Sequence, residues 1–218
     1  MTRHSIIATQ LENQGLLSHT IGSVPSLPNP AIVIWGKHAP RHDNLPLLML
    51  SSLITDVKPT IYVDDIASQV FCGRTYKEQE KYNKLYTSFF ANYKCEVYFS
   101  SDLYQEEFGA DILTPLLSIA SRVSTSGFIR DLPENKKTIY QKLPASEIMN
   151  ALLELLLFEQ VSKKHNSLVI RHFTQGIVWN YLKIAKKPLA AFVVPRLEGE
   201  KAIDEYLSLA KSHYRDIA

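Results

Sequence analysis

The feature that most constrains the fold is an alternation of short apolar runs with longer amphipathic segments. Residues 31–35 form a β-branched apolar run that stops at Gly36, which is typical of a buried parallel strand. Apolar positions then recur at helical spacing over 45–54, and Pro59 precedes a second strand at 60–63. This βαβ unit predicts an α/β fold with a doubly wound parallel sheet.

The same alternation continues along the chain. It predicts further strands at 96–99, 167–171 and 190–194, and helices at 76–93, 108–121, 147–160, 177–185 and 200–214. Residues 122–142 are polar and are expected to form a loop. Residues 1–30 end in a proline-rich stretch, so we expect an N-terminal arm that wraps the surface, followed by a single domain over 31–218.

Composition narrows the class of protein. With 45% hydrophobic residues in 218, the chain can bury a full core, and a net charge of +2 gives no global field for nucleic acid or membrane. Any basic surface must therefore be local. No apolar run approaches the roughly 20 residues that cross a bilayer, so no membrane contact is expected. The two cysteines and the polar start predict a reduced, cytoplasmic protein, and the sequence does not indicate an oligomeric state.

Polar residues follow the predicted strands at their carboxyl ends, where open parallel sheets bind ligands. After the first strand, residues 36–44 lead into a helix whose first amides attract phosphate or carboxylate groups, with Lys37 and His42 beside them. The alternative is that Asp43 or Asn44 caps this helix and the basic residues are solvated.

The second strand is followed by Asp64 and Asp65, and then by Ser68. Two adjacent acids suit an ammonium, a guanidinium or a metal-bridged phosphate, although either acid can also cap a helix. After the third strand, Ser101 and Asp102 offer a hydroxyl and an acid, and these too are ordinary capping residues.

The next predicted strand end brings an imidazole and an amide together at His172 and Gln175. His172 can act as an acid or a base, since histidine titrates near neutrality, and a buried structural histidine is the alternative. The sequence has no convincing metal-ligand spacing, and no glycine-rich phosphate loop or Gly-x-Ser-x-Gly elbow, so neither a metal nor a cofactor is predicted.

Taken in order, these segments resemble the Rossmann (HUP) catalytic domain of class I aminoacyl-tRNA synthetases, especially the tryptophanyl and tyrosyl branch. Residues 40–45 fall where that family carries its HIGH motif, so His42 matches its first histidine while Asp43 and Asn44 differ. The stretch 62–67 resembles the acidic end of the second strand, and 98–104 resembles the segment before the connecting helices.

Two further segments extend the resemblance. One segment is residues 143–147, which include Glu147, and the other is residues 172–175. They fall where the family recognises its amino acid and at the corresponding end of its sheet. Where a KMSKS loop would follow, 195–202 has one lysine and lacks the serine pair. Both signatures hold ATP phosphates in synthetases, so this departure implies that the chain does not activate amino acids with ATP.

A synthetase-like domain without ATP signatures resembles the cyclodipeptide synthases, which join aminoacyl groups taken from charged tRNAs. Gly36-Lys37-His38 stands where that family has Gly-x-Ser, so the resemblance implies a divergent branch, such as the arginine-using one, with no assigned nucleophile. If arginine is handled, Asp64 and Asp65 are best suited to pair with its guanidinium.

The resemblance thus implies an aminoacyl-tRNA-dependent transferase that forms a peptide bond or a cyclodipeptide without ATP and needs no cofactor, with charged tRNA and a small-molecule amino-acid moiety as its partners. The alternatives are an ATP-using aminoacyl- or nucleotidyl-transferring enzyme of the same superfold, and an inactive tRNA-binding paralogue. The candidate catalytic residues are His42, Asp43 and His172, and the candidate substrate-binding residues are Lys37, Asn44, Tyr62, Asp64, Asp65, Ser68, Ser101, Asp102, Glu147 and Gln175.

We expect contacts to tRNA to come from lysines gathered on one side of the molecule. The alternative is that these lysines are scattered over the surface. They are Lys136, Lys137, Lys142, Lys163, Lys164, Lys183, Lys186 and Lys187.

Overall fold

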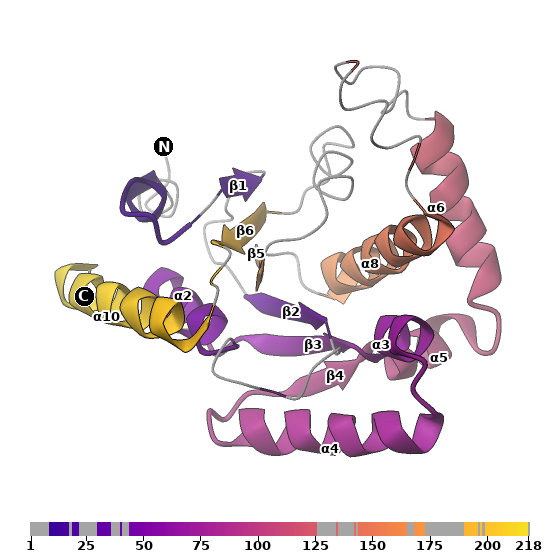
Figure 1. The fold of residues 1–218 in the computed structure, drawn as a ribbon, viewed down its shortest axis with the longest axis horizontal. Helices are drawn as coiled ribbons and strands as arrows, with labels where there is room; N and C mark the ends of the chain where they lie inside the picture. The colour runs from indigo at the N-terminus through magenta and orange to yellow at the C-terminus, as the bar shows by residue number, and fades with distance from the viewer. Residues whose placement is uncertain are drawn as a thin grey trace.

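The structure is a computed structural model of the 218-residue chain. It describes residues 9–17, 19–21, 30–35, 40, 44–125, 134, 142, 144–164, 168–172, 190–195, 197 and 199–217. In this part of the chain, strands form a single sheet in the order β1-β6-β5-β2-β3-β4 (Figure 1). The strands are β1 (His19–Ile21), β2 (Ala31–Trp35), β3 (Thr60–Asp64), β4 (Val97–Phe99), β5 (Leu168–His172) and β6 (Ala190–Val194).

Every described neighbour pair from β6 to β4 is parallel, and only the edge strand β1 runs antiparallel to its neighbour β6. The parallel strands follow the doubly wound order, in which the first strand of the unit, β2, lies at the centre. The predicted α/β class with a doubly wound parallel sheet is confirmed. The strand order reverses between β2 and β5, and this is the place where such sheets bind ligands.

Helices cover both faces of the sheet. They are α2 (Leu45–Ile54), α3 (Asp65–Cys72), α4 (Tyr76–Ala91), α5 (Ser100–Phe108), α6 (Leu113–Thr125), α8 (Ala145–Lys164) and α10 (Gly199–Ile217). One core joins α3, α5, α6 and α8 to strand residues such as Val33 and Tyr62. The other joins α2, α4 and α10 to residues such as Ile61 and Val63. Successive strand residues therefore serve opposite cores.

Several predicted elements are confirmed. The strands at 31–35 and 190–194 and the helix at 45–54 have the predicted bounds, and other elements are shifted slightly at their ends. The predicted helix at 108–121 is wrong at its start, because α5 and α6 are separate helices there. Gly109 ends α5 with a φ of 61°, which glycine adopts without strain, and α6 begins at Leu113. The predicted helix at 177–185 lies outside the described residues.

Local signals explain where α3 and α4 meet. Gly73 closes α3 in the left-handed region, with a φ of 62°. Thr75 then caps α4: its hydroxyl accepts from the Glu78 amide at 3.3 Å, and the Glu78 carboxylate accepts from the Thr75 amide at 2.9 Å. This reciprocal capping box starts α4 at Tyr76.

Residues 9–21 differ from the expected surface arm. Leu11, Leu16 and Leu17 are buried in the core shared with α2 and α10, and β1 extends the sheet beyond β6. The Tyr206 hydroxyl donates to the Leu16 carbonyl at 3.0 Å. The prolines at 25–30 suggested an arm, but the three leucines bury apolar surface and so tie this segment to the fold.

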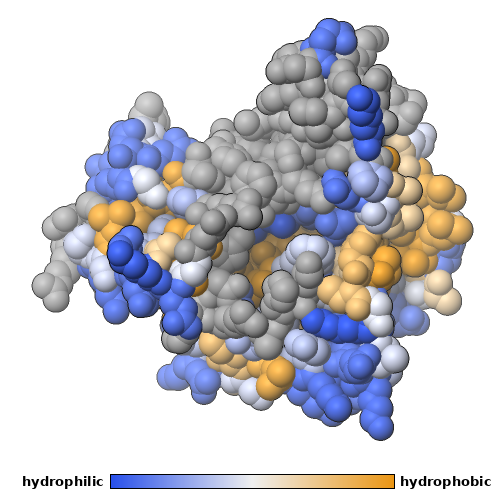
Figure 2. All heavy atoms as spheres, viewed as in Figure 1, coloured by the Kyte–Doolittle hydropathy of each residue, from blue (hydrophilic) through white to orange (hydrophobic). Residues whose placement is uncertain are grey.

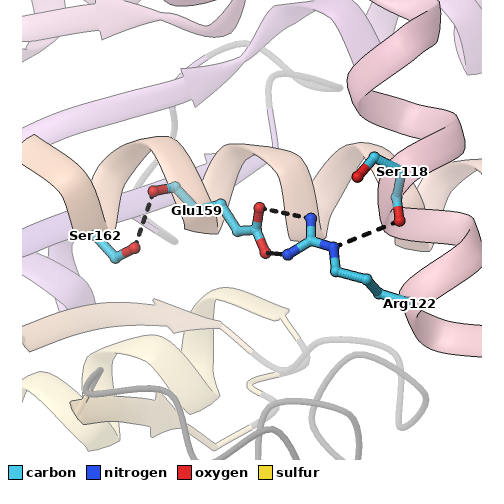
Figure 3. A network of polar contacts seen from close by, with 4 residues as sticks. All are labelled: Ser118, Arg122, Glu159 and Ser162. Carbon is cyan, nitrogen blue, oxygen red and sulfur yellow. Dashed lines mark hydrogen bonds and ion pairs between the residues drawn. The ribbon is translucent and has the colours of Figure 1, made fainter. Parts of the chain in front are cut away.

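The helices α6 and α8 lie against each other. Apolar surface is visible over the region of these helices in Figure 2. Their exposed apolar residues are Leu113, Leu117, Ile148 and Met149. A bidentate ion pair joins the two helices, because the Arg122 guanidinium donates to both carboxylate oxygens of Glu159, at 2.8 and 2.9 Å (Figure 3). Within the described residues, no helix has both the length and the apolar content to cross a membrane.

Candidate functional site

The carboxyl ends of β2, β3 and β4 point to the same side of the molecule, where α3 and α5 begin (Figure 1). The chain passes from strand to helix without a linker at both places, from Asp64 to Asp65 and from Phe99 to Ser100. The first turns of α3 and α5 therefore lie directly at the strand ends. This juxtaposition brings two acids and two serines together.

Asp65 is buried and its carboxylate is surrounded by donors. One oxygen accepts from the Ser101 amide and lies within hydrogen-bond distance of the Ser100 hydroxyl, both at 2.9 Å. The other accepts from the Ser101 hydroxyl at 2.7 Å and from the Asn83 amide group at 3.1 Å. Asp65 thus ties the start of α3 to α5 and α4, and its charge is compensated by hydrogen bonds.

Asp64 caps α3, and its Oδ1 accepts from the Ala67 amide at 3.1 Å and lies 3.0 Å from the Ser100 hydroxyl. Burial raises the pKa of Asp64 to about 6; the hydrogen bonds from Ala67 and Ser100 oppose this rise, and the charges of Asp65 and Glu154 add to it. Asp64 therefore changes its protonation state near neutral pH.

The geometry around Ser100 explains how a proton on Asp64 is accommodated. The Ser100 hydroxyl has one hydrogen but lies within 3.0 Å of both carboxylates, and it also accepts from the Ile66 amide at 3.2 Å. One hydrogen cannot serve both acids. With Asp64 protonated, Asp64 donates to Ser100 and Ser100 donates to Asp65, so every group has a partner.

A buried ion pair between Glu154 and Arg171 lies next to Asp64. Glu154 interrupts the apolar run of α8, Arg171 is the penultimate residue of β5, and each side chain is 10% exposed. Burial lowers the pKa of Arg171, and the charges of Glu154 and Asp64 oppose this shift. The guanidinium also lies 5.3 Å from the centre of the Phe158 ring. Sequence reasoning missed both residues, although an acid inside a long apolar helical run was a signal of a buried partner.

Three tyrosines, Tyr62, Tyr98 and Tyr104, come from β3, β4 and α5 around this site. Tyr62 precedes Asp64 by two residues, so it faces the same side of β3, and its ring stacks on Tyr98 with centres 5.6 Å apart. The Tyr104 hydroxyl donates to the Leu153 carbonyl at 3.3 Å. Burial raises the pKa of both Tyr62 and Tyr104, and the charges of Asp64 and Asp65 add to the rise at Tyr104. Both phenols therefore stay protonated at neutral pH.

The other predicted substrate residues are less closely grouped. Ser68 is buried in α3, and its hydroxyl has no hydrogen-bond partner among the described residues. Asp102 is exposed in the first turn of α5, and partial burial and the charge of Asp65 raise its pKa. Glu147 is exposed in the first turn of α8, about 10 Å along the helix from Glu154. Asn44 is buried before α2, but its side chain makes no capping hydrogen bond.

The remaining predicted residues lie partly or wholly outside the described structure. His172 ends β5 beside Val194, and only its backbone is described. Lys37, His42, Asp43 and Gln175 lie outside the described residues. In the described ranges, no three histidine, cysteine, aspartate or glutamate side chains form a metal-binding group.

Of the lysines that sequence suggested for tRNA, two pair with acids of α5. Lys163 donates to Glu107 at 2.6 Å and Lys164 to Glu106 at 2.9 Å. Lys142 is exposed, and the others lie outside the described residues. The described lysines therefore do not form an isolated basic patch.

Comparison with known proteins shows what this architecture is similar to. No protein-family model matches the sequence, and no curated protein matches it. Tyrosyl-tRNA synthetase from Archaeoglobus fulgidus, solved with L-tyrosine, superposes with a TM-score of 0.56 at 13% identity; the match covers 88% of this chain and 65% of that one. A C-terminally truncated mitochondrial tyrosyl-tRNA synthetase from Coccidioides posadasii gives 0.55 at 10% identity, over 89% and 68% of the two chains.

This chain spans less than two thirds of the length of the archaeal synthetase. The likeness supports the class I part of the sequence-based resemblance, and the shared feature is the fold. The strand order, the two-sided helix cover and these neighbours lead to one conclusion: the chain has the Rossmann-like α/β fold of class I aminoacyl-tRNA synthetases.

Proposed function

We propose that the protein is an aminoacyl-tRNA-dependent transferase that forms an amide bond, or closes a cyclodipeptide, without ATP. The observation that carries this proposal is the acidic character of the end of β3, where Asp64 and Asp65 are adjacent and Glu154 of α8 is close enough to act on the pKa of Asp64. Arg171, the partner of Glu154, also lies near Asp64. An aminoacyl ester carries a cationic ammonium, whereas ATP carries a polyphosphate. The acids attract the first and repel the second.

In this proposal Asp64 accepts a proton from the substrate ammonium. The freed amine nitrogen then attacks the ester carbonyl of an aminoacyl-tRNA; the carbon–nitrogen bond forms and the bond to the ribose oxygen breaks. The nitrogen gives up its second proton as the leaving ribose oxygen takes up one, so this step releases no net proton. A pKa of about 6 suits Asp64 to this exchange at neutral pH. Asp65 and Ser100 are positioning residues that hold Asp64 in place.

The other candidate residues keep their predicted places in this proposal. His172, at the end of β5 next to Arg171, is the proposed donor of the proton to the leaving ribose oxygen. His42 and Asp43 are proposed to complete the catalytic set from the segment after β2. Residues 31–218 are proposed to form the catalytic domain, which residues 9–21 complete, in a cytoplasmic protein that binds charged tRNA.

The direct test supplies the two possible energy sources separately. The protein is incubated with a pool of charged tRNAs without ATP, and in parallel with ATP and free amino acids, and products are identified by mass spectrometry. We expect dipeptide or cyclodipeptide only from the charged tRNAs. ATP-dependent release of pyrophosphate with free amino acids would overturn the proposal in favour of an ATP-using enzyme.

A matched pair of variants assigns the role of Asp64. Asp64→Asn keeps the shape and the capping oxygen but cannot take up the proton, so we expect product formation to fall by about 10²-fold or more. Asp204→Asn makes the same change at an exposed position of α10 and should leave the rate unchanged. Full activity of folded Asp64→Asn would exclude Asp64 as the proton acceptor.

A further inference from the structure

A cavity of about 400 Å³ lies between α2, α10 and the loops that lead into β3 and β4. Its wall is mainly apolar and includes Leu48 and Met49 from α2 and Leu207 from α10. Pro59, which immediately precedes β3, also lines it, whereas Asp64 ends that strand about 16 Å away. The cavity is therefore separate from the carboxylate cluster at the opposite end of the sheet.

A buried hydroxyl in the cavity wall has no partner. Ser51 is 0% exposed, it is one of the lining residues, and its Oγ makes no hydrogen bond with any described residue. Burying an unsatisfied hydroxyl costs about 1–3 kcal/mol, so proteins rarely leave one in a core without a reason. The hydroxyl is covered even with the cavity empty, so a bound molecule would touch the side chains around it and not the hydroxyl itself.

Two cations lie at the rim of the same cavity. Lys58 comes from the loop before β3 and Lys211 from α10, both are exposed, and Asp56 is the single acid in the lining. Burial raises the pKa of the Cys95 thiol, which also lines the cavity, and the nearby positive charge of Lys58 opposes that rise. The charge of Lys58 therefore acts on the interior of the cavity.

We propose that this cavity binds a small apolar molecule carrying a carboxylate. The apolar body lies between α2 and α10, and the carboxylate pairs with Lys58 and Lys211. A volume of about 400 Å³ falls within the range of small-molecule sites and suits a medium-chain fatty acid in size. The net positive rim selects a carboxylate over a neutral molecule of the same length.

The two cysteines provide a local readout. Both are free thiols, Cys95 in the cavity wall and Cys72 at the end of α3. The intact protein is labelled with iodoacetamide in the presence of octanoate or octan-1-ol, and each cysteine peptide is followed by mass spectrometry. We expect saturating octanoate to slow labelling of Cys95 at least tenfold, to leave Cys72 unchanged, and to protect at lower concentration than octan-1-ol.

Variants separate binding from folding. Lys58→Gln and Lys211→Gln should each weaken octanoate several-fold and leave octan-1-ol unchanged, while the control Lys201→Gln, an exposed lysine of α10 outside the cavity, should change neither. Equal protection by the two probes, protection of Cys72 to the same degree, or unchanged octanoate binding in both lysine variants would overturn the proposal.

Discussion

The two acids at the end of β3 are neighbours in the sequence but lie in different surroundings. Asp65 faces α4 and α5, where hydroxyl and amide groups from Ser100, Ser101 and Asn83 converge on its two oxygens. At Asp64, burial acts most strongly against ionisation, and the charges of Asp65 and of Glu154 from α8 add to this effect. The difference shows that successive residues at one strand end can have very different surroundings, one with hydrogen-bond donors on both carboxylate oxygens and one with a raised pKa.

The largest effect should come from removing the cation beside Asp64. Arg171→Met leaves the Glu154 carboxylate buried without its ion-pair partner, so we expect the free energy of unfolding to fall by about 3–5 kcal/mol in urea titrations. The double variant Arg171→Met/Glu154→Leu removes both charges and should recover most of that loss. A loss below about 1 kcal/mol in the single variant would show that water reaches this ion pair.

A smaller loss is expected when the hydrogen-bonded carboxylate of Asp65 is changed. Asp65→Asn preserves the shape but turns one acceptor oxygen into a donor that faces other donors, so the unfolding free energy should fall by about 2–3 kcal/mol. Thermal unfolding measures this, with Asp204→Asn as the control. An unchanged melting temperature would mean that the donors around Asp65 find other partners.

The pH dependence of stability should distinguish Asp64 from Asp65. The pKa of Asp64 is about 6 in the folded protein against an ordinary value of 3.8, so the folded state binds the proton more tightly. The stability that this proton confers is fully present below about pH 4 and is lost as the pH rises through 6, a change of about 2–3 kcal/mol.

Asp64→Asn has no proton to lose and should flatten this part of the profile. We expect the variant to gain stability relative to the unmodified protein at pH 7.5 but not at pH 4.5, as measured by urea unfolding at both values. A parallel profile for the two proteins would show that Asp64 is already ionised at low pH in the folded state.

The smallest effect is expected at the ion pair between α6 and α8. Arg122 and Glu159 form two hydrogen bonds, but their side chains are 42% and 22% exposed, so Arg122→Ala should cost only about 0.5–1 kcal/mol. Because exposed charges are screened, this cost should shrink in 1 M NaCl, whereas the cost of Arg171→Met should persist. If the stability lost in Arg122→Ala did not change with salt, the Arg122–Glu159 pair would behave as a buried ion pair that is shielded from solvent.

Sequence patterns predicted the parallel strands well, because their apolar runs and flanking breaks are local signals. Helices at the positions of α3 and α5 were not predicted because each begins directly at a strand end, although the acids and serine there were recognised as possible helix caps. The edge strand β1 is only three residues long and depends on pairing with β6. Its formation is a property of the folded chain rather than of its own sequence.

The candidate site was predictable to the same extent. Asp64, Asp65 and Ser101 were expected at one edge of the sheet, and the structure brings them together. Glu154 and Arg171 were missed because their burial depends on how α8 lies against β5, which no local pattern specifies. The raised pKa of Asp64 comes mainly from burial, with the charges of Asp65 and Glu154 adding to it, so this chemical property also emerges only from the three-dimensional arrangement.

The pairing of β1 with β6 has a consequence for how the protein is made. His19–Ile21 finds its partner only in Ala191–Val193, and Leu16 accepts its hydrogen bond from Tyr206 of α10. During synthesis on the ribosome, the earliest leucines of the core must therefore wait for almost the whole chain to emerge. Contacts of such long sequence separation slow folding, so the nascent N-terminal segment is the part expected to need a chaperone.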